Sequence, residues 1–100
     1  MAQRRSQRSS GNVFRDLGFG PDEAGNLRVR ADLMIALSKL IEDRGLTQVK
    51  AAKLFGVSQP RVSDLVRGKI ERFSVDTLIA MLGAAGMQVT VTTRPRARVA

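Results

Sequence analysis

The 100-residue sequence contains no cysteine, histidine, tryptophan or tyrosine. Without cysteine no disulfide can form, which fits a reducing, intracellular setting, so we expect a cytoplasmic protein. Without cysteine and histidine the usual zinc ligands are missing, and so is the commonest general base. The sequence also shows no nucleophile–base pair and no phosphate-binding glycine loop. We therefore expect neither an enzyme nor a bound metal or cofactor.

Long apolar runs are missing as well. The apolar run at 33–37 is far shorter than the ~20 residues that a membrane-spanning helix needs. Residues 1–10 are rich in arginine and serine, and no apolar stretch follows them, as it would in a signal peptide. Hydrophobic residues still make up 43% of the chain and phenylalanine is the one aromatic type. The sequence thus predicts one small soluble domain with an aliphatic core and no membrane partner.

Acidic residues are scarce in the middle of the chain, and this gives the net charge of +8 a pattern. Residues 44–72 hold seven basic and two acidic side chains, whereas residues 11–43 hold four basic and six acidic ones. Residues 1–10 and 94–98 add three arginines each. Solubility alone would account for basic tails but not for a basic middle segment. The pattern predicts a polyanionic partner that binds at a defined surface.

The chain divides into one domain with two tails. Residues 1–11 and 94–100 have the composition of basic tails, and we expect the first of them to be disordered. Residues 12–93 form the predicted domain. Within it, residues 12–20 are short and interrupted by glycine, so we expect a short strand or turn there.

Apolar periodicity predicts at least four helices. The longest helix is predicted to end where the basic residue Arg44 is followed by Gly45, a common helix C-terminus. The apolar periodicity supports this helix from Asp32 onward. Pro21 is a possible first residue, but Gly25 and Asn26 speak against a helix there, and residues 21–31 stay undecided. Further helices are predicted at about 48–55, from a Ser58 cap to about 67, and from Ser74 to Gly83 or Gly86.

Residues 87–93, MQVTVTT, alternate between two faces and are rich in valine and threonine, which predicts a β-strand. A lone strand needs a partner for its backbone groups, and three are open: residues 13–14, the same strand of a second copy, or another protein. The predicted fold is mainly α, with four or five helices and a C-terminal β-strand.

The stretch TQVKAAKLFGVSQPRVSDLVRG, residues 47–68, meets the requirements of two short helices joined by a tight turn. Ala52 is small where the helices cross, and Gly56 tolerates the positive φ of the turn. The outward positions of the second helix are polar. Apolar side chains are expected to face inward at Ala51, Phe55, Val57, Val62 and Leu65. This pattern is typical of a helix-turn-helix.

Leu-Thr-Gln at 46–48, Ala-Ala at 51–52, Gly-Val-Ser-Gln at 56–59 and Val-Ser-x-Leu-x-x-Gly at 62–68 resemble the lambda-repressor/Cro-like, or XRE, helix-turn-helix family. The flanks Asn-Val-Phe-Arg-Asp-Leu-Gly, Phe-Ser-Val-Asp-Thr-Leu and a terminal Val-Thr-Val resemble a subgroup of small antitoxins similar to HigA. This second resemblance implies a RelE/ParE-like toxin as a partner.

The XRE resemblance implies that the second motif helix lies in the major groove of duplex DNA. Gln59 would then bind adenine through its amide, Pro60 would touch a thymine methyl group, and Arg61 would reach guanine or a phosphate. Asp64 would either accept from cytosine N4 or orient one of the neighbouring arginines, Arg61 or Arg67.

Other residues of the motif are implied to position the protein on the DNA backbone. Gln48 and Thr47 open the first motif helix, where the helix N-terminus also attracts a phosphate. Arg67, Lys69 and Arg72 follow the second motif helix. The predicted DNA-binding residues are Thr47, Gln48, Ser58, Gln59, Pro60, Arg61, Ser63, Asp64, Arg67 and Lys69.

These features predict a dimeric, sequence-specific repressor that binds a near-palindromic operator, controls its own operon and neutralises a toxin. A homodimer is expected because one motif contacts few bases, and because Met34, Ile35, Met81 and Met87 add apolar surface that needs either core or interface contacts. The alternatives are a stand-alone, phage-like XRE regulator and an RNA-binding or adaptor protein with the same fold.

Overall fold

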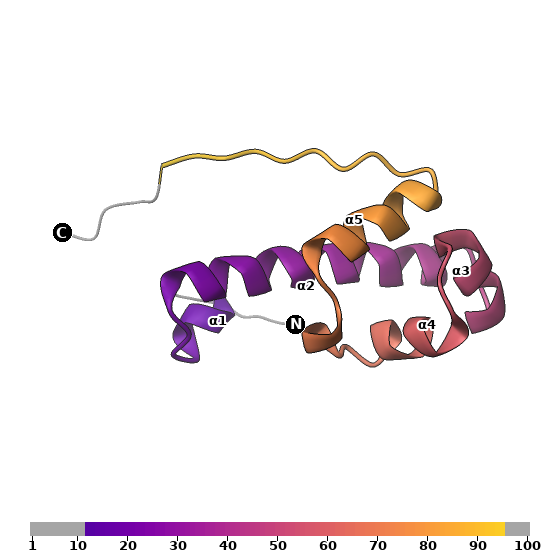
Figure 1. Ribbon diagram of the computed structural model, residues 1–100, viewed down its shortest axis with the longest axis horizontal. Helices are drawn as coiled ribbons and strands as arrows, with labels where there is room; N and C mark the ends of the chain where they lie inside the picture. The colour runs from indigo at the N-terminus through magenta and orange to yellow at the C-terminus, as the bar shows by residue number, and fades with distance from the viewer. Residues whose placement is uncertain (1–11, 96–100) are drawn as a thin grey trace.

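A computed structural model describes residues 12–95, and Figure 1 shows them as a set of helices followed by an extended segment. The tail predicted at 1–11, and residues 96–100 of the tail predicted at 94–100, lie outside the described residues. The described chain contains five α-helices and one short 3₁₀ helix. Their bounds are α1 Val13–Asp16, α2 Pro21–Asp43, α3 Gln48–Phe55, α4 Gln59–Val66, η1 Ile70–Arg72 and α5 Val75–Ala84.

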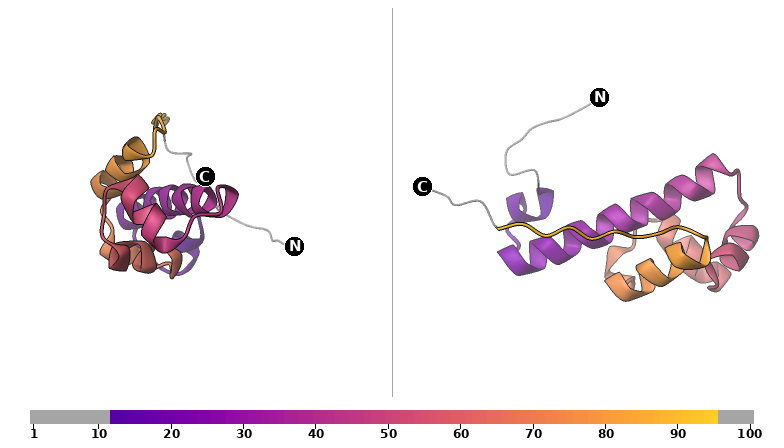
Figure 2. Two further views of the ribbon diagram at one scale, coloured as in Figure 1. Left: turned by 90° about the vertical axis from the view of Figure 1, so that its right-hand side faces the viewer. Right: turned by 90° about the horizontal axis from the view of Figure 1, so that it is seen from above.

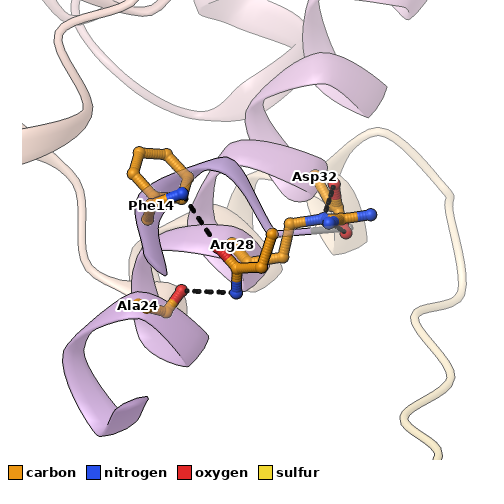
Figure 3. Close-up of polar contacts among 5 residues, drawn as sticks. Phe14, Ala24, Arg28 and Asp32 are labelled. Carbon is orange, nitrogen blue, oxygen red and sulfur yellow. Dashed lines mark hydrogen bonds and ion pairs between the residues drawn. The ribbon is translucent and has the colours of Figure 1, made fainter. Parts of the chain in front are cut away.

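The segment at 12–20 begins with a helix, α1, and not with the strand or turn expected from the sequence. Asn12 caps this helix: its Oδ1 accepts from the Phe14 amide at 3.0 Å, and its Nδ2 donates to the Ala24 carbonyl at 3.2 Å (Figure 3). The Phe14 and Phe19 rings meet edge to face, with centroids 6.2 Å apart. A side-chain cap and a contact with α2 therefore stabilise a helix too short to be predicted from periodicity.

Helix α2 is 23 residues long and includes the undecided segment 21–31. Pro21 stands at its first turn, where the missing N–H costs nothing. The side chain of Asn26 accepts from Arg30 Nε at 2.7 Å within the helix, and Ala24 and Leu27 are buried. Tertiary packing thus overrides the weak helix propensity of Gly25 and Asn26. No helix in the described part of the chain has the length and hydropathy that crossing a membrane requires.

The core lies between the middle and C-terminal half of α2, the helix pair α3–α4, and α5 (Figures 1 and 2). The inward positions predicted for the motif are all part of it, with Val57 only partly buried. Met34 and Met81 are core residues, whereas Ile35 and Met87 are exposed. The buried cluster comprises Met34, Leu37, Ala51, Ala52, Phe55, Val62, Leu65, Phe73, Leu78, Met81, Leu82 and Ala85.

The turn between α3 and α4 depends on Gly56, which has φ +69° and ψ +34°. An added Cβ would meet no atom within 4 Å there, so the cost of a side chain is conformational and not steric crowding. We expect Gly56→Ala to lower the free energy of unfolding by about 1–2 kcal/mol in a urea titration, because alanine disfavours the left-handed region. Gly83→Ala is the matched control: Gly83 lies within α5, also in open space, and alanine there should stabilise the fold by up to about 1 kcal/mol. Equal effects of the two substitutions would contradict this account.

The predicted C-terminal β-strand is wrong, because the described residues contain no strand. Residues 87–95 run as an extended segment along the length of α2 and apart from it (Figures 1 and 2). Met87 N donates to Leu82 O, but the backbone of residues 88–93 makes no hydrogen bond to the rest of the described chain. Val89 packs against the core, while Val91 is 74% exposed. The side chains of residues 87–93 alternate as they do in a strand. The described residues, however, contain no neighbouring strand with which this segment could form backbone hydrogen bonds.

Candidate nucleic-acid interface

The N-terminal ends of α3 and α4 carry the first group of predicted residues. Thr47 caps α3, its Oγ1 accepting from the Lys50 amide at 3.1 Å, and Ser58 caps α4 by accepting from the Arg61 amide at 3.4 Å. Both caps leave other first-turn N–H groups without a helical acceptor and add the positive end of a helix dipole. Each helix therefore begins with a local attraction for an anion such as a phosphate.

The exposed start of α4 consists of Ser58, Gln59 and Pro60. Gln59 is the first residue of the helix, and no other side chain of the described residues holds its amide. The amide offers both a donor and an acceptor, which is the pair needed for a bidentate contact with adenine. Pro60 follows at a position where the absent N–H costs no helical hydrogen bond. This end of α4 is thus free for contact with a groove of DNA.

Arg61 is directed along the protein surface to the segment that follows α4. Its Nη1 donates to the Arg72 carbonyl at 2.7 Å, and its guanidinium lies 5.3 Å from the centroid of the buried Phe73 ring. A carbonyl bond and a cation–π contact together fix the position of the guanidinium. In this arrangement Arg61 can present its remaining N–H groups to a phosphate but is not extended toward base edges.

Asp64 forms an ion pair with Arg72, with Oδ1 and Nη1 3.0 Å apart. The sequence had suggested Arg61 or Arg67 as the arginine that Asp64 orients, and the structure pairs it with Arg72 instead. The Asp64 side chain is 19% exposed. The structure therefore brings Arg61 and Asp64 together with Arg72, and α4 is tied to η1 at two points.

We expect Arg61→Lys to lower the free energy of unfolding by about 1 kcal/mol, because lysine keeps the charge but loses the bond to the Arg72 carbonyl and weakens the contact with Phe73. Thermal unfolding followed by circular dichroism measures the change. Arg67→Lys is the control, since Arg67 is exposed and no side-chain bond fixes it within the described chain, so its effect should stay within about 0.5 kcal/mol. If the two variants unfold alike, Arg61 has no role in holding η1.

Arg30 is a positioning residue that the sequence did not reveal. Its Nη1 donates to the carbonyls of Ile70 at 3.2 Å and Phe73 at 3.3 Å, across some forty residues of sequence. The Phe73 carbonyl follows η1 and lies outside any helix, while the Ile70 carbonyl, which also accepts from the Phe73 amide, gains a second donor. No local pattern predicts such a contact, because the acceptors are main-chain atoms brought near by the tertiary fold.

The remaining predicted residues flank the start of α4 and the contacts of Arg61 and Asp64 with Arg72. Gln48 is half-buried at the first position of α3, and Ser63 is half-buried on α4. Arg67 and Lys69 follow α4, and their cationic groups have no acidic partner within 4 Å in the described part of the chain. They extend the basic segment 44–72 beyond the C-terminal end of α4.

Comparison with known proteins identifies relatives of this fold. The model of a family described as a helix-turn-helix domain matches residues 13–94. A solved structure assigned to the XRE family of transcriptional regulators shares 35% sequence identity, with 78% of this chain and 90% of that chain covered and a TM-score of 0.67. A comparison with curated proteins gives no match. The family match spans α1 through the extended C-terminal segment, not the motif alone.

Proposed function

Since the chain belongs to the helix-turn-helix domain family, a DNA-binding family of transcriptional regulators of the XRE type, we propose that it represses transcription by binding a near-palindromic operator as a homodimer. The observation that carries the proposal is the start of α4. Its exposed Gln59 stands at the end of a helix packed tightly by Val62 and Leu65, so a flexible donor–acceptor group is presented on a rigid support.

The residues divide into base contacts and phosphate contacts in this proposal. Gln59 binds adenine in the major groove, and Pro60 packs against a neighbouring thymine methyl group. Arg61, held by Arg72 and Phe73, contacts a phosphate and fixes the depth of α4 in the groove. Gln48 and Thr47 bind a phosphate at the start of α3.

Arg67 and Lys69 supply the sequence-independent share of the affinity by neutralising phosphates and releasing counterions. We expect Lys69→Ala to weaken binding to operator and shuffled duplexes by a similar factor and to reduce the slope of log K against log salt by about one. Fluorescence anisotropy over a salt series measures both. Arg15→Ala, on α1 and outside the motif, should leave the slope unchanged. A selective loss of operator binding by Lys69→Ala would show that Lys69 contacts bases instead.

An electrophoretic shift assay tests the proposed function itself. The full chain should shift duplex DNA from its own promoter in preference to a shuffled duplex, and in preference to an RNA duplex of the same sequence. Equal binding to the RNA would favour the RNA-binding alternative. Undiminished operator binding by a Gln59→Ala, Arg61→Ala double variant would exclude base recognition by α4.

The finer proposal is that the regulator is the antitoxin of a type II toxin–antitoxin pair. Its support is the HigA-like flanks, Asn12–Gly18 and Phe73–Leu78, together with the extended segment 87–95, whose exposed apolar side chains and free backbone groups are available to a protein partner. The stand-alone regulator is the competing function. Co-expression with the adjacent reading frame separates them: a small basic toxin that co-purifies with the full chain and is inhibited by it supports the antitoxin, and a neighbour that does neither supports the stand-alone regulator.

A further inference from the structure

One face of α2 carries an ordered row of exposed side chains that the DNA-binding motif does not use. The spacing of four, three, four and three residues places the row along a single stripe of the helix. All its members are exposed, and a hydrophobic residue that is 64% exposed stands at its centre. We name this row the α2 stripe: Arg28, Asp32, Ile35, Lys39 and Glu42.

An apolar groove of about 610 Å³ runs beside the α2 stripe. It lies between α2 and the C-terminal end of α4, with Met34 and Ile35 on one side and Leu65 and Val66 on the other. Val66 is 45% exposed. The described chain leaves this groove open, so an apolar surface is continuous with the centre of the stripe.

We propose that a second copy of this chain packs antiparallel on the α2 stripe, with the twofold axis at Ile35. Antiparallel pairing about Ile35 sets Arg28 opposite Glu42 of the second copy, and it sets Asp32 within one residue of Lys39 of the second copy. Both pairs join opposite charges, and the twofold axis repeats each pair. Parallel pairing would instead set every charged residue of the stripe opposite its own copy, which like charges disfavour.

Contacts within the helix do not compete strongly with this arrangement. Arg28 Nε and Asp32 Oδ1 are 3.3 Å apart (Figure 3). Lys39 Nζ and Asp43 Oδ2 are 3.8 Å apart, and all four side chains are about half exposed or more. Exposed pairs of this kind contribute little to stability, so they can rearrange or be shared at an interface. The charges of the α2 stripe alternate in sign, so they are complementary to the same stripe in the opposite direction. They are not complementary to a uniformly basic segment such as residues 1–10.

The arrangement rests on the proposed operator binding and gives it a geometry. Helix α4 lies beside α2 with its C-terminal end directed toward the middle of α2, where Val66 lines the groove (Figure 1). Its eight residues span about 12 Å. Because the twofold axis reverses α2, the Gln59 ends of the two α4 helices point toward opposite ends of the dimer, as the two half-sites of a near-palindrome require.

Sedimentation of the full chain without DNA tests the interface. We expect a wild-type dimer at micromolar concentration and at least a roughly 100-fold higher dimer Kd for Ile35→Glu, because two carboxylates would meet at the axis. Val29→Glu is the matched control: Val29 is a 46% exposed residue of the same helix but lies off the stripe, so its dimer Kd should stay within about threefold of wild type. Circular dichroism confirms that both variants are folded.

A charge exchange tests the predicted pairing directly. Arg28→Glu and Glu42→Arg should each raise the dimer Kd by about tenfold, because each sets like charges opposite one another twice in the homodimer. An equimolar mixture of the two variants should restore a dimer of near wild-type affinity, since the mixed dimer has opposite charges at both positions. Failure of the mixture to recover would overturn the antiparallel register.

The outcomes separate the interface from the function. A wild-type dimer that Ile35→Glu leaves intact would place the interface elsewhere and overturn the α2 stripe, while dimeric operator binding would stand. A wild-type chain that is monomeric at concentrations where it shifts the operator would overturn both.

Discussion

Gln59→Ala is expected to reduce discrimination at one operator base pair in each half-site by about 1–3 kcal/mol, a factor of roughly 5 to 150 in Kd. The wild-type amide donates to and accepts from adenine, and alanine can do neither. The variant should bind its native operator and an operator changed at that base pair with similar affinity. Anisotropy titrations of both duplexes with both proteins measure the effect.

Gln48→Ala supplies the control for this experiment, because it removes the same amide from the start of α3, where we assign a phosphate contact. It should weaken binding to all duplexes by a similar factor and leave the preference for the native base pair intact. Both residues lie at helix starts outside the buried cluster, so neither substitution should shift the unfolding temperature appreciably. A Gln59→Ala variant that keeps its full preference would show that α4 recognises the operator through other side chains.

Phe73→Ala is the substitution expected to affect stability most, lowering the free energy of unfolding by about 3–5 kcal/mol. Phe73 is 2% exposed, packs in the core next to η1, and its ring supports the Arg61 guanidinium. The loss is a large share of the roughly 5–15 kcal/mol that holds a small domain together. Urea unfolding followed by circular dichroism measures it.

Phe73→Leu separates the two roles of the ring. Leucine fills most of the volume, so the free energy of unfolding should fall by less than about 1.5 kcal/mol, but the cation–π contact with Arg61 is lost. The leucine variant should therefore be folded at room temperature yet bind DNA more weakly. Equal stability of the alanine and wild-type proteins would mean that Phe73 does not anchor η1.

The motif itself was predictable because its signals are local. Thr47, Gly56 and Ser58 act through their own backbone geometry or through an amide three residues away. Caps and left-handed glycines are recognisable from a few neighbouring residues, so the helix starts at 48 and 59 and the turn at 56 could be placed before any tertiary contact was known.

The features that the sequence did not predict depend on contacts between distant residues. Helix α1 needs the bond from Asn12 to Ala24, and the start of α2 needs burial of Ala24 and Leu27. The Arg61 and Arg30 side chains bind carbonyls of the segment 70–73, which carry no residue-specific signal. The strand prediction for 87–93 was wrong for the opposite reason: it used the local alternation of side chains, but pairing requires a neighbouring strand, and residues 12–95 provide none.

Selection of bound duplexes from a random DNA library tests the central claim most directly, because the protein itself then picks out its operator. Recognition by the start of α4 in a twofold dimer predicts enrichment of a near-palindrome with half-sites about 10 base pairs apart, bound roughly 10³-fold or more tightly than shuffled DNA. An adenine in each half-site should lose its enrichment when Gln59→Ala replaces the wild type. A bound pool with no shared sequence, or one that is identical for the two proteins, would contradict the account.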